Sequence, residues 1–134
     1  MAKIESRIGV IKSSEEKIYN FLSDFNNFKN LVPEDRVKEW ESTEDTCKFT
    51  VEGVGQVGLK IIEKEPHKLI KITSDETTPL SFNLWIQIKS VEENDSRIKI
   101  TVEADVNPLM ASMVKGPLQS FVDTLVEQAE KMEF

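Results

Sequence analysis

The residue types that most often carry out catalysis or bind metals are scarce in this sequence. It contains one histidine, His67, and one cysteine, Cys47. His67 stands in a Pro-His-Lys turn without the carboxylate or further ligands that a general base or a metal ligand needs, so we expect an exposed turn residue. Cys47 shares a strand face with apolar neighbours and is expected inside as a small hydrophobe. Because no Cys/His cluster exists, the sequence predicts no metal site. No glycine-rich phosphate loop appears either, and we expect no cofactor.

The carboxylates of segment Val37–Ser42 are the next candidates for chemistry. Glu39 and Glu41 alternate with Lys38 and Trp40, so only one of the two sets points inward if the segment is a strand. We expect Trp40 inside, because burying its ring is favourable and burying two acids is not. In the opposite parity Glu39 would become a cavity acid with a raised pKa. The sequence therefore predicts no catalytic residue.

The last third of the chain supplies elements that could hold a site. Arg97–Val106 alternates apolar and polar residues as a strand does. Asn107 and Pro108 follow, an N-cap residue and a proline suited to the first helical position. From there to Phe134 apolar residues recur at helical spacing. This stripe is wider than a coiled-coil seam, so we expect a sheet to cover it.

The upstream sequence predicts a strand, two short helices and five more strands. The first strand would place on one face Ile4, Ser6, Ile8 and Val10. A capping box from Ser13 to Glu16 opens the first helix, and Pro33 stops the second. The further strands have the spacing of a meander and are expected at 37–42, 47–51, 57–62, 69–73 and 82–88, with a tight hairpin at 53–55.

One compact arrangement suits this order of elements. About seven antiparallel strands form a curved sheet, and the long C-terminal helix lies across its concave side. The period-two pattern assigns apolar side chains to the concave face and polar ones to the convex face. We therefore predict an α+β fold with the order β-α-α-β6-α, in a single domain that spans residues 1–134.

Composition excludes several classes of partner. The net charge is −7, and no basic patch is visible, which argues against nucleic acid and anionic lipid surfaces. The longest apolar runs are a few residues, so we expect no membrane-spanning helix. The N-terminus lacks the apolar core of a signal peptide. A single cysteine cannot form an internal disulfide, and it fits a reducing cytoplasm.

Four segments carry a resemblance to a known superfamily: Ser13–Asp24, Leu31–Pro33, Lys64–Pro66 and Asn107–Met110. Together with the order of elements, they resemble the START-like helix-grip (SRPBCC) superfamily of polyketide cyclases, lipid-transfer domains and pollen-allergen-like proteins. The likeness covers essentially the whole chain and is strongest to small bacterial members of unassigned activity. It implies a pocket between sheet and helix. Activators of chaperone ATPases share the fold, but no segment here marks that role.

We therefore expect the chain to bind or transport an apolar or amphipathic small molecule, such as a lipid or a polyketide. A cyclase or dehydratase is the alternative by resemblance, and it would need a positioned acid or base. Met110 and Met113 are expected at one end of the cavity, beside a kink at Pro117. The residues expected to line it are Phe49, Val51, Leu59, Ile61, Ile70, Ile72, Phe82, Leu84, Ile86, Ile100, Val102, Met110, Met113, Val114, Pro117 and Phe121.

Trp85 interrupts the polar pattern of the convex face. Its strand turns Leu84 and Ile86 inward, so the indole should stand outside, and Ile62 breaks the same face on another strand. Large apolar groups on a solvated sheet indicate a partner surface, for a homodimer or for another protein. Cover by a long side chain such as lysine is the alternative.

Overall fold

The computed structural model describes residues 2–32, 37–51, 55–76, 78 and 81–132. The elements are β1 (Ala2–Glu5), β2 (Gly9–Ile11), α1 (Glu15–Leu22), the 3-10 helix η1 (Phe25–Asn30), β3 (Val37–Ser42), β4 (Thr46–Val51), β5 (Gly55–Glu65), β6 (Leu69–Ser74), β7 (Phe82–Glu92), β8 (Asp95–Ala104) and α2 (Pro108–Lys131). The predicted order is confirmed, with the first strand divided in two. Pro33 and the hairpin residues Gly53 and Val54 lie outside the described residues.

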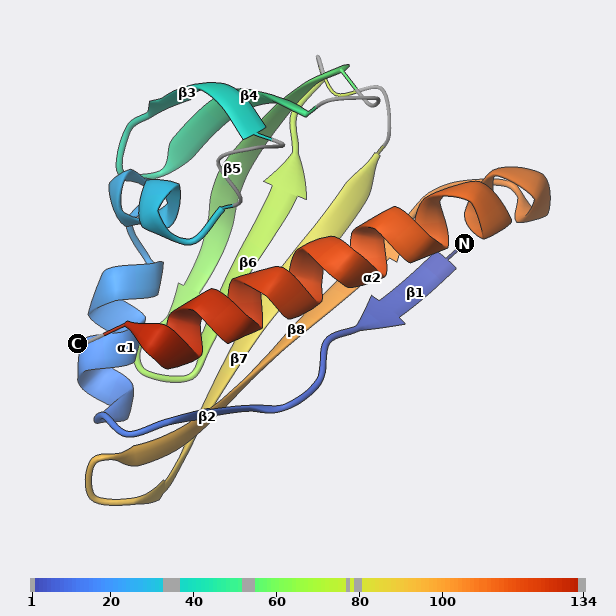
Figure 1. Cartoon of the computed structure of the whole chain (residues 1–134). Coiled ribbons are helices and arrows are strands. Elements are labelled where there is room, and N and C mark those ends of the chain that lie inside the picture. Colours follow the sequence, from blue (N-terminus) through green and yellow to red (C-terminus); the bar gives the residue numbers. More distant parts are fainter. Residues whose placement is uncertain (1, 33–36, 52–54, 77, 79–80, 133–134) are drawn as a thin grey trace.

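The strands form one antiparallel sheet that curves around α2. Their order is β1-β8-β7-β6-β5-β4-β3, and β2 also pairs with β8. Figure 1 shows α2 lying across one face of this sheet, with α1 and η1 beside its C-terminal end. The predicted α+β helix-grip architecture is confirmed, with eight strands instead of about seven.

The additional strand arises from an interruption at Ser6. The N–H of Ser6 donates to the carbonyl of Ile100 at 2.8 Å, but the N–H of Ile100 donates to the Ser6 hydroxyl at 2.9 Å. A side-chain oxygen thus replaces a backbone acceptor, which interrupts the regular ladder. Beyond this point Ile8 and Val10 are exposed and Ile11 is buried. The prediction that Ile8 and Val10 share the face of the buried Ile4 is therefore wrong.

Helix α1 begins one residue later than the capping box predicts. Its N-cap is Ser14, whose hydroxyl accepts a hydrogen bond from the N–H of Lys17 at 3.2 Å. Ser13 is buried instead, and its carbonyl accepts a hydrogen bond from the Ser96 hydroxyl at 2.9 Å. The first serine therefore ties the entrance of α1 to β8, and the second caps the helix.

Helix α2 begins where the sequence predicts, but its two halves differ in environment. The Asn107 side chain caps it by accepting the N–H of Met110 at 2.8 Å. The C-terminal half buries Val122, Leu125, Val126 and Ala129. The N-terminal half extends past the sheet in Figure 1, and Leu109, Met110 and Met113 are exposed there. The helix is continuous through Pro117.

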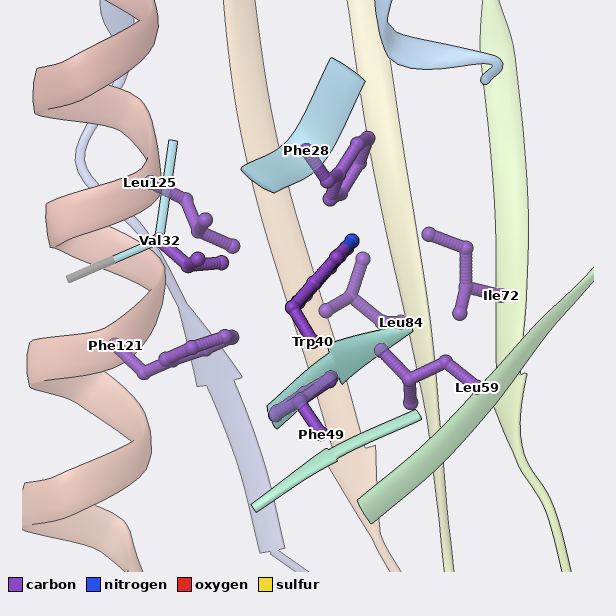
Figure 2. Close-up of a pocket in the computed structure, with 9 residues that line it drawn as sticks. All are labelled: Phe28, Val32, Trp40, Phe49, Leu59, Ile72, Leu84, Phe121 and Leu125. Carbon is purple, nitrogen blue, oxygen red and sulfur yellow. The ribbon is translucent and has the colours of Figure 1, made fainter. Parts of the chain in front are cut away.

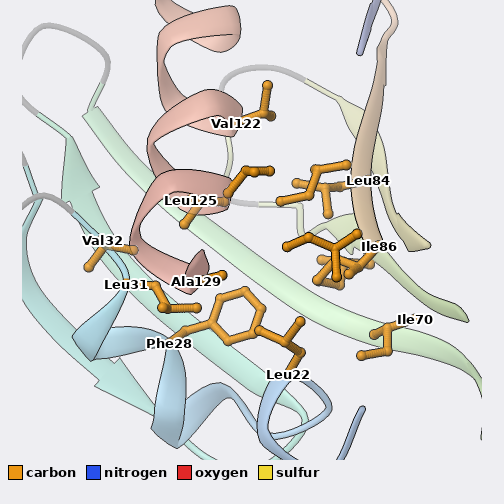
Figure 3. Close-up of a cluster of buried hydrophobic side chains, with 14 of the residues drawn as sticks. Leu22, Phe28, Leu31, Val32, Ile70, Leu84, Ile86, Val122, Leu125 and Ala129 are labelled. Atoms are coloured by element: carbon orange, nitrogen blue, oxygen red, sulfur yellow. The ribbon is translucent and has the colours of Figure 1, made fainter. Parts of the chain in front are cut away.

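The core fills the space between the concave face of the sheet, α2 and the two small helices. Figure 3 shows side chains from all of these elements converging, among them Leu22, Phe28, Leu84 and Leu125. The predicted inward parity of the strands is confirmed, since Cys47, Phe49, Leu59, Ile70, Ile72, Leu84, Ile86, Ile98, Ile100 and Val102 are all buried. Each such side chain contributes about 1.5–3 kcal/mol of hydrophobic stabilisation.

Trp85 lies on the convex side, as its parity predicts. It is half-buried and opposes Lys71 on β6 and Thr101 on β8. The Lys71 Nζ stands 5.3 Å from the centroid of the indole ring. A cation–π contact of this kind covers part of the ring with a lysine side chain. Lysine thus covers part of the indole, while Ile62 on the same face is 51% exposed, and the partner surface stays a prediction.

Candidate ligand-binding site

An apolar pocket lies between the sheet and α2, closed on one side by η1 and strands β3 and β4 (Figure 2). Its lining residues come from five strands, α2, η1 and the residues that follow η1. The free volume is about 10 Å³, and the lining comprises Phe28, Val32, Trp40, Phe49, Leu59, Ile72, Leu84, Phe121 and Leu125. In this conformation the side chains fill nearly all of the space between sheet and helix.

A second void of about 10 Å³ lies deeper, towards α1. It is lined by Leu22, Phe28, Leu31, Ile86, Ile98, Ile100, Leu125 and Ala129. Each void has room for about one water molecule and nothing larger. The open hollow expected between helix and sheet is therefore not present in this conformation. Phe28 and Leu125 line both voids, so these two side chains separate them.

A β-bulge directs Trp40 into the pocket. Val37 is buried at the start of β3, so an uninterrupted strand would also turn Glu39 and Glu41 inward. The register shifts between Lys38 and Glu41, and Glu39 has a positive φ of 56°. The bulge reverses the parity, which leaves Glu39 and Glu41 exposed and Trp40 partly buried. The expectation that Trp40 lies inside is confirmed.

The indole of Trp40 is held by stacking, and its polar atom has no partner. The centroid of its ring lies 5.1 Å from the centroid of the Phe49 ring, and the two ring planes are 16° apart. The Nε1 atom is buried without a hydrogen-bond acceptor among the described residues. Figure 2 shows this nitrogen directed between Leu84 and Phe28, across the pocket. A buried donor without an acceptor destabilises a fold by about 1–3 kcal/mol, and buried tryptophans usually find one.

The residues expected to line a cavity occupy different places in the structure. Phe49, Leu59, Ile72, Leu84 and Phe121 line the first void, and Ile86 and Ile100 line the second. Ile70 and Val102 are buried in the core, and Val51, Ile61 and Phe82 pack at its periphery. Met110, Met113 and Pro117 are exposed, which corrects the expectation that they border the cavity. The Val114 side chain lies outside the described part of the structure.

Four residues that line the first void were absent from that expected set: Phe28, Val32, Trp40 and Leu125. Trp40 was expected inside, and Leu125 belongs to the apolar stripe of the last helix, so sequence signals existed for both. Phe28 and Val32 lie in and after a short 3-10 helix, where apolar periodicity is too brief to assign a face.

The pocket lining offers no group for proton transfer among the described residues, because every lining side chain is apolar or aromatic. Cys47 lies nearby in β4, where burial raises the pKa of its thiol to about 12 despite a hydrogen bond from the Leu59 backbone. It therefore stays protonated near neutral pH and is a poor nucleophile. His67 is half-buried, not exposed as expected, and its ring meets Tyr19 edge-on with centroids 5.8 Å apart.

Within the described ranges, no group of three or more His, Cys, Asp or Glu side chains is arranged to hold a metal ion. No helix in the same ranges has the length and apolar character needed to cross a membrane.

A curved antiparallel sheet that grips a C-terminal helix over an apolar pocket defines the helix-grip fold of START-like proteins. The sequence matches the polyketide cyclase / dehydrase and lipid transport family over residues 1–130, and the chain belongs to that family. The resemblance seen in the sequence is thereby confirmed. Among proteins of curated function, none matches the sequence.

Similar solved structures agree on the fold. A START superfamily protein from Mycobacterium smegmatis superposes with a TM-score of 0.71 at 11% identity, covering 98% of this chain and 96% of that one. The protein XoxI from Bacillus cereus superposes with a TM-score of 0.71 at 15% identity, covering 98% of this chain and 96% of that one. The fold is also similar to that of a norcoclaurine synthase point mutant from Thalictrum flavum, solved in complex with a transition-state analogue. The TM-score is 0.72 at 16% identity, and the match covers 96% of this chain and 94% of that one. At these identities the likeness concerns the fold alone.

Proposed function

We propose that this protein binds an apolar or amphipathic small molecule in the pocket between the sheet, η1 and α2. The observation that carries the proposal is the pocket wall, in which nine side chains from separate elements are all apolar or aromatic. Small-molecule sites are typically lined in this way, with few polar groups. Membership of a family that includes lipid transport and polyketide cyclisation supports the same class of ligand.

Binding requires the lining to move, because two voids of about 10 Å³ each cannot hold an organic ligand. Phe28 separates the voids and projects from the short helix η1. Trp40 and Phe121 are only partly buried and belong to β3 and α2. The backbone of α2 packs mainly along β1, β2 and β8, at the far edge of the sheet from β3. A rotation of Phe28 would open a connection between the voids, and a shift of β3 away from α2 would enlarge the first one, without disturbing that packing.

We propose binding in preference to catalysis because of what the lining contains. Cyclisation or dehydration needs an acid or base within reach of the ligand. The lining side chains in the described ranges provide none, and Glu39, the acid that the opposite strand parity would supply, is exposed. The pocket supports retention of a ligand by burial of apolar surface.

Recovery of a bound molecule tests the proposal. The purified protein is incubated with a cell lipid extract, separated again by gel filtration, and analysed by mass spectrometry for compounds that co-migrate with it. We expect an apolar or amphipathic compound in a fixed ratio to protein. Phe121→Gln, which places an amide at the rim of the pocket, should reduce the recovered amount several-fold.

Leu109→Gln is the matched control, since it makes a comparable change on the same helix at a side chain that is 75% exposed. It should retain the wild-type amount. Equal recovery from the wild type and Phe121→Gln would place binding elsewhere. No recovery, together with NMR spectra unchanged by fatty acids and aromatic ketones, would refute the proposal.

A further inference from the structure

The indole nitrogen of Trp40 adds a hydrogen-bond donor to the otherwise apolar pocket. The Nε1 atom is buried, has no acceptor among the described residues, and is directed across the pocket (Figure 2). A phenylalanine or leucine at this position would also pack on Phe49 without burying an unpaired donor. Since the indole N–H can only donate a hydrogen bond, a ligand that completes the site must present an acceptor.

We infer that Trp40 is the specificity-determining donor of the pocket, and that the ligand carries a neutral carbonyl or similar acceptor oxygen on an apolar body. This inference rests on the proposed function. The N–H of Trp40 hydrogen-bonds to that oxygen, while Phe49 holds the indole plane by stacking at 5.1 Å. A hydrogen bond formed in a water-excluded site discriminates against ligands that leave the donor unpaired.

The lining favours a neutral acceptor over a carboxylate. A carboxylate inside the pocket would need cationic or multiple hydrogen-bonding partners to offset its loss of hydration. The lining residues in the described ranges include no lysine, arginine or histidine, and Trp40 supplies one donor. A ketone, ester or quinone oxygen needs no counter-charge, so its burial against a single donor is far less unfavourable.

Three probes of nearly equal shape test the inference: 2-acetonaphthone, 2-isopropenylnaphthalene and 2-naphthoate. The first presents a carbonyl, the second replaces its oxygen by a methylene group, and the third is charged. We expect titration calorimetry or NMR to give the ketone about tenfold higher affinity than its hydrocarbon isostere, with the carboxylate weaker than the ketone. In ¹⁵N-labelled protein the Trp40 indole N–H signal should move downfield with the ketone. The indole signal of Trp85, the other tryptophan, is the internal reference.

The variant Trp40→Phe removes the donor and keeps an aromatic ring against Phe49. It should reduce ketone affinity about tenfold, to the level of the isostere, and leave isostere affinity unchanged. Equal binding of ketone and isostere by the wild type, with the Trp40 signal unshifted, would overturn the inference and leave the proposed function intact. If none of the three probes binds the wild type, the inference is overturned, and recovery of a compound from the lipid extract decides the proposed function separately. The wild-type indole shift decides the outcome even if Trp40→Phe does not fold.

Discussion

Glu130 of α2 accepts a hydrogen bond of 2.9 Å from the backbone N–H of Val10, in the strand that follows the interruption at Ser6. The same carboxylate pairs with Arg7, whose backbone N–H donates to Asp123 at 3.0 Å. Two acidic side chains of the helix thus bind the backbone N–H groups of Arg7 and Val10 and the Arg7 guanidinium. These contacts hold the C-terminal half of α2 on the sheet.

Replacing Glu130 by glutamine should therefore destabilise the fold. We expect a loss of about 1 kcal/mol at pH 7, because the charge-assisted hydrogen bonds weaken while the shape is retained. Urea denaturation of Glu130→Gln and the wild type measures this. Glu127→Gln is the control, since Glu127 pairs with Lys131 on the same helix, both side chains are more than half exposed, and the variant should lose much less.

The effect of Glu130→Gln should also depend on pH. Hydrogen bonds from Arg7 and from the Val10 backbone lower the pKa of Glu130 from its ordinary value of 4.5. The ionised form is favoured in the folded state, so its stabilisation is complete above pH ~5 and disappears as the pH falls through the lowered pKa. The stability difference between wild type and variant should shrink towards acid pH. A difference that stays constant from pH 7 to pH 3 would contradict this origin.

Gly58 on β5 is required by a close approach of Asp75. A Cβ at position 58 would lie 1.8 Å from Asp75 Oδ2, and the Asp75 N–H donates to the Gly58 carbonyl at 2.8 Å. The Thr78 hydroxyl bonds both residues. Gly58→Ala must displace this carboxylate and should cost about 1–3 kcal/mol, measured by thermal and urea unfolding.

Gly116→Ala is the matched control for that glycine. A Cβ at position 116 would meet no atom within 4 Å in the described part of the structure, apart from its chain neighbours and the backbone of its own helix. Alanine raises helix propensity by about 0.5–1 kcal/mol, but crowding by Pro117 on the next residue opposes the gain, so the net change should be small. Equal effects at both positions would show that Asp75 moves aside without loss.

Leu125 should control the size of the closed pocket, since it lines both voids and is 3% exposed. Leu125→Ala removes side-chain atoms between them and should cost about 3 kcal/mol, because the surroundings collapse only in part. The enlarged apolar cavity should bind benzene or xenon, which NMR detects. Leu109→Ala on the exposed half of α2 should change neither property. A variant that loses stability and binds neither probe would mean that the cavity closes.

Cys47 should be protected from alkylation in the folded state. Burial raises the pKa of its thiol from 9.0 to about 12, which at pH 8 leaves on the order of a thousandfold less thiolate than in the unfolded chain. Iodoacetamide should label it rapidly only in denaturant. Rapid labelling under native conditions would show that β4 opens readily.

Because the pKa of Cys47 is raised, we also expect the folded state to lose stability at alkaline pH. Above pH ~9 the unfolded chain gains by ionising Cys47 while the folded chain does not, so stability falls as the pH rises from 9 towards 12. Other groups titrate in this range, so Cys47→Val is compared with the wild type at each pH. Above pH 9 the free energy of unfolding of the wild type should fall relative to that of Cys47→Val.

Much of this architecture followed from the sequence because it depends on local periodicity. The alternation in β4, β7 and β8 identified the inward face, since a strand has one face to bury and each position belongs to one side. The Asn107 cap and the apolar stripe located α2. The same local rules failed at Ser6 and Ser13. The Ser6 hydroxyl accepts the N–H of Ile100, and the Ser13 carbonyl accepts the Ser96 hydroxyl, and both partners lie in β8, far from these serines in the sequence.

The pocket itself was decided by tertiary structure. The parity of Trp40 rests on a bulge at Glu39, and bulges are set by how neighbouring strands twist and pair. Met110 and Met113 fit the apolar stripe, yet they are exposed because α2 is longer than the sheet beneath it. Period and spacing determine which side of an element is apolar. Only the three-dimensional packing of Phe28, Trp40, Phe49 and Phe121 decides how little volume remains, because free volume is what large side chains from separate elements leave between them.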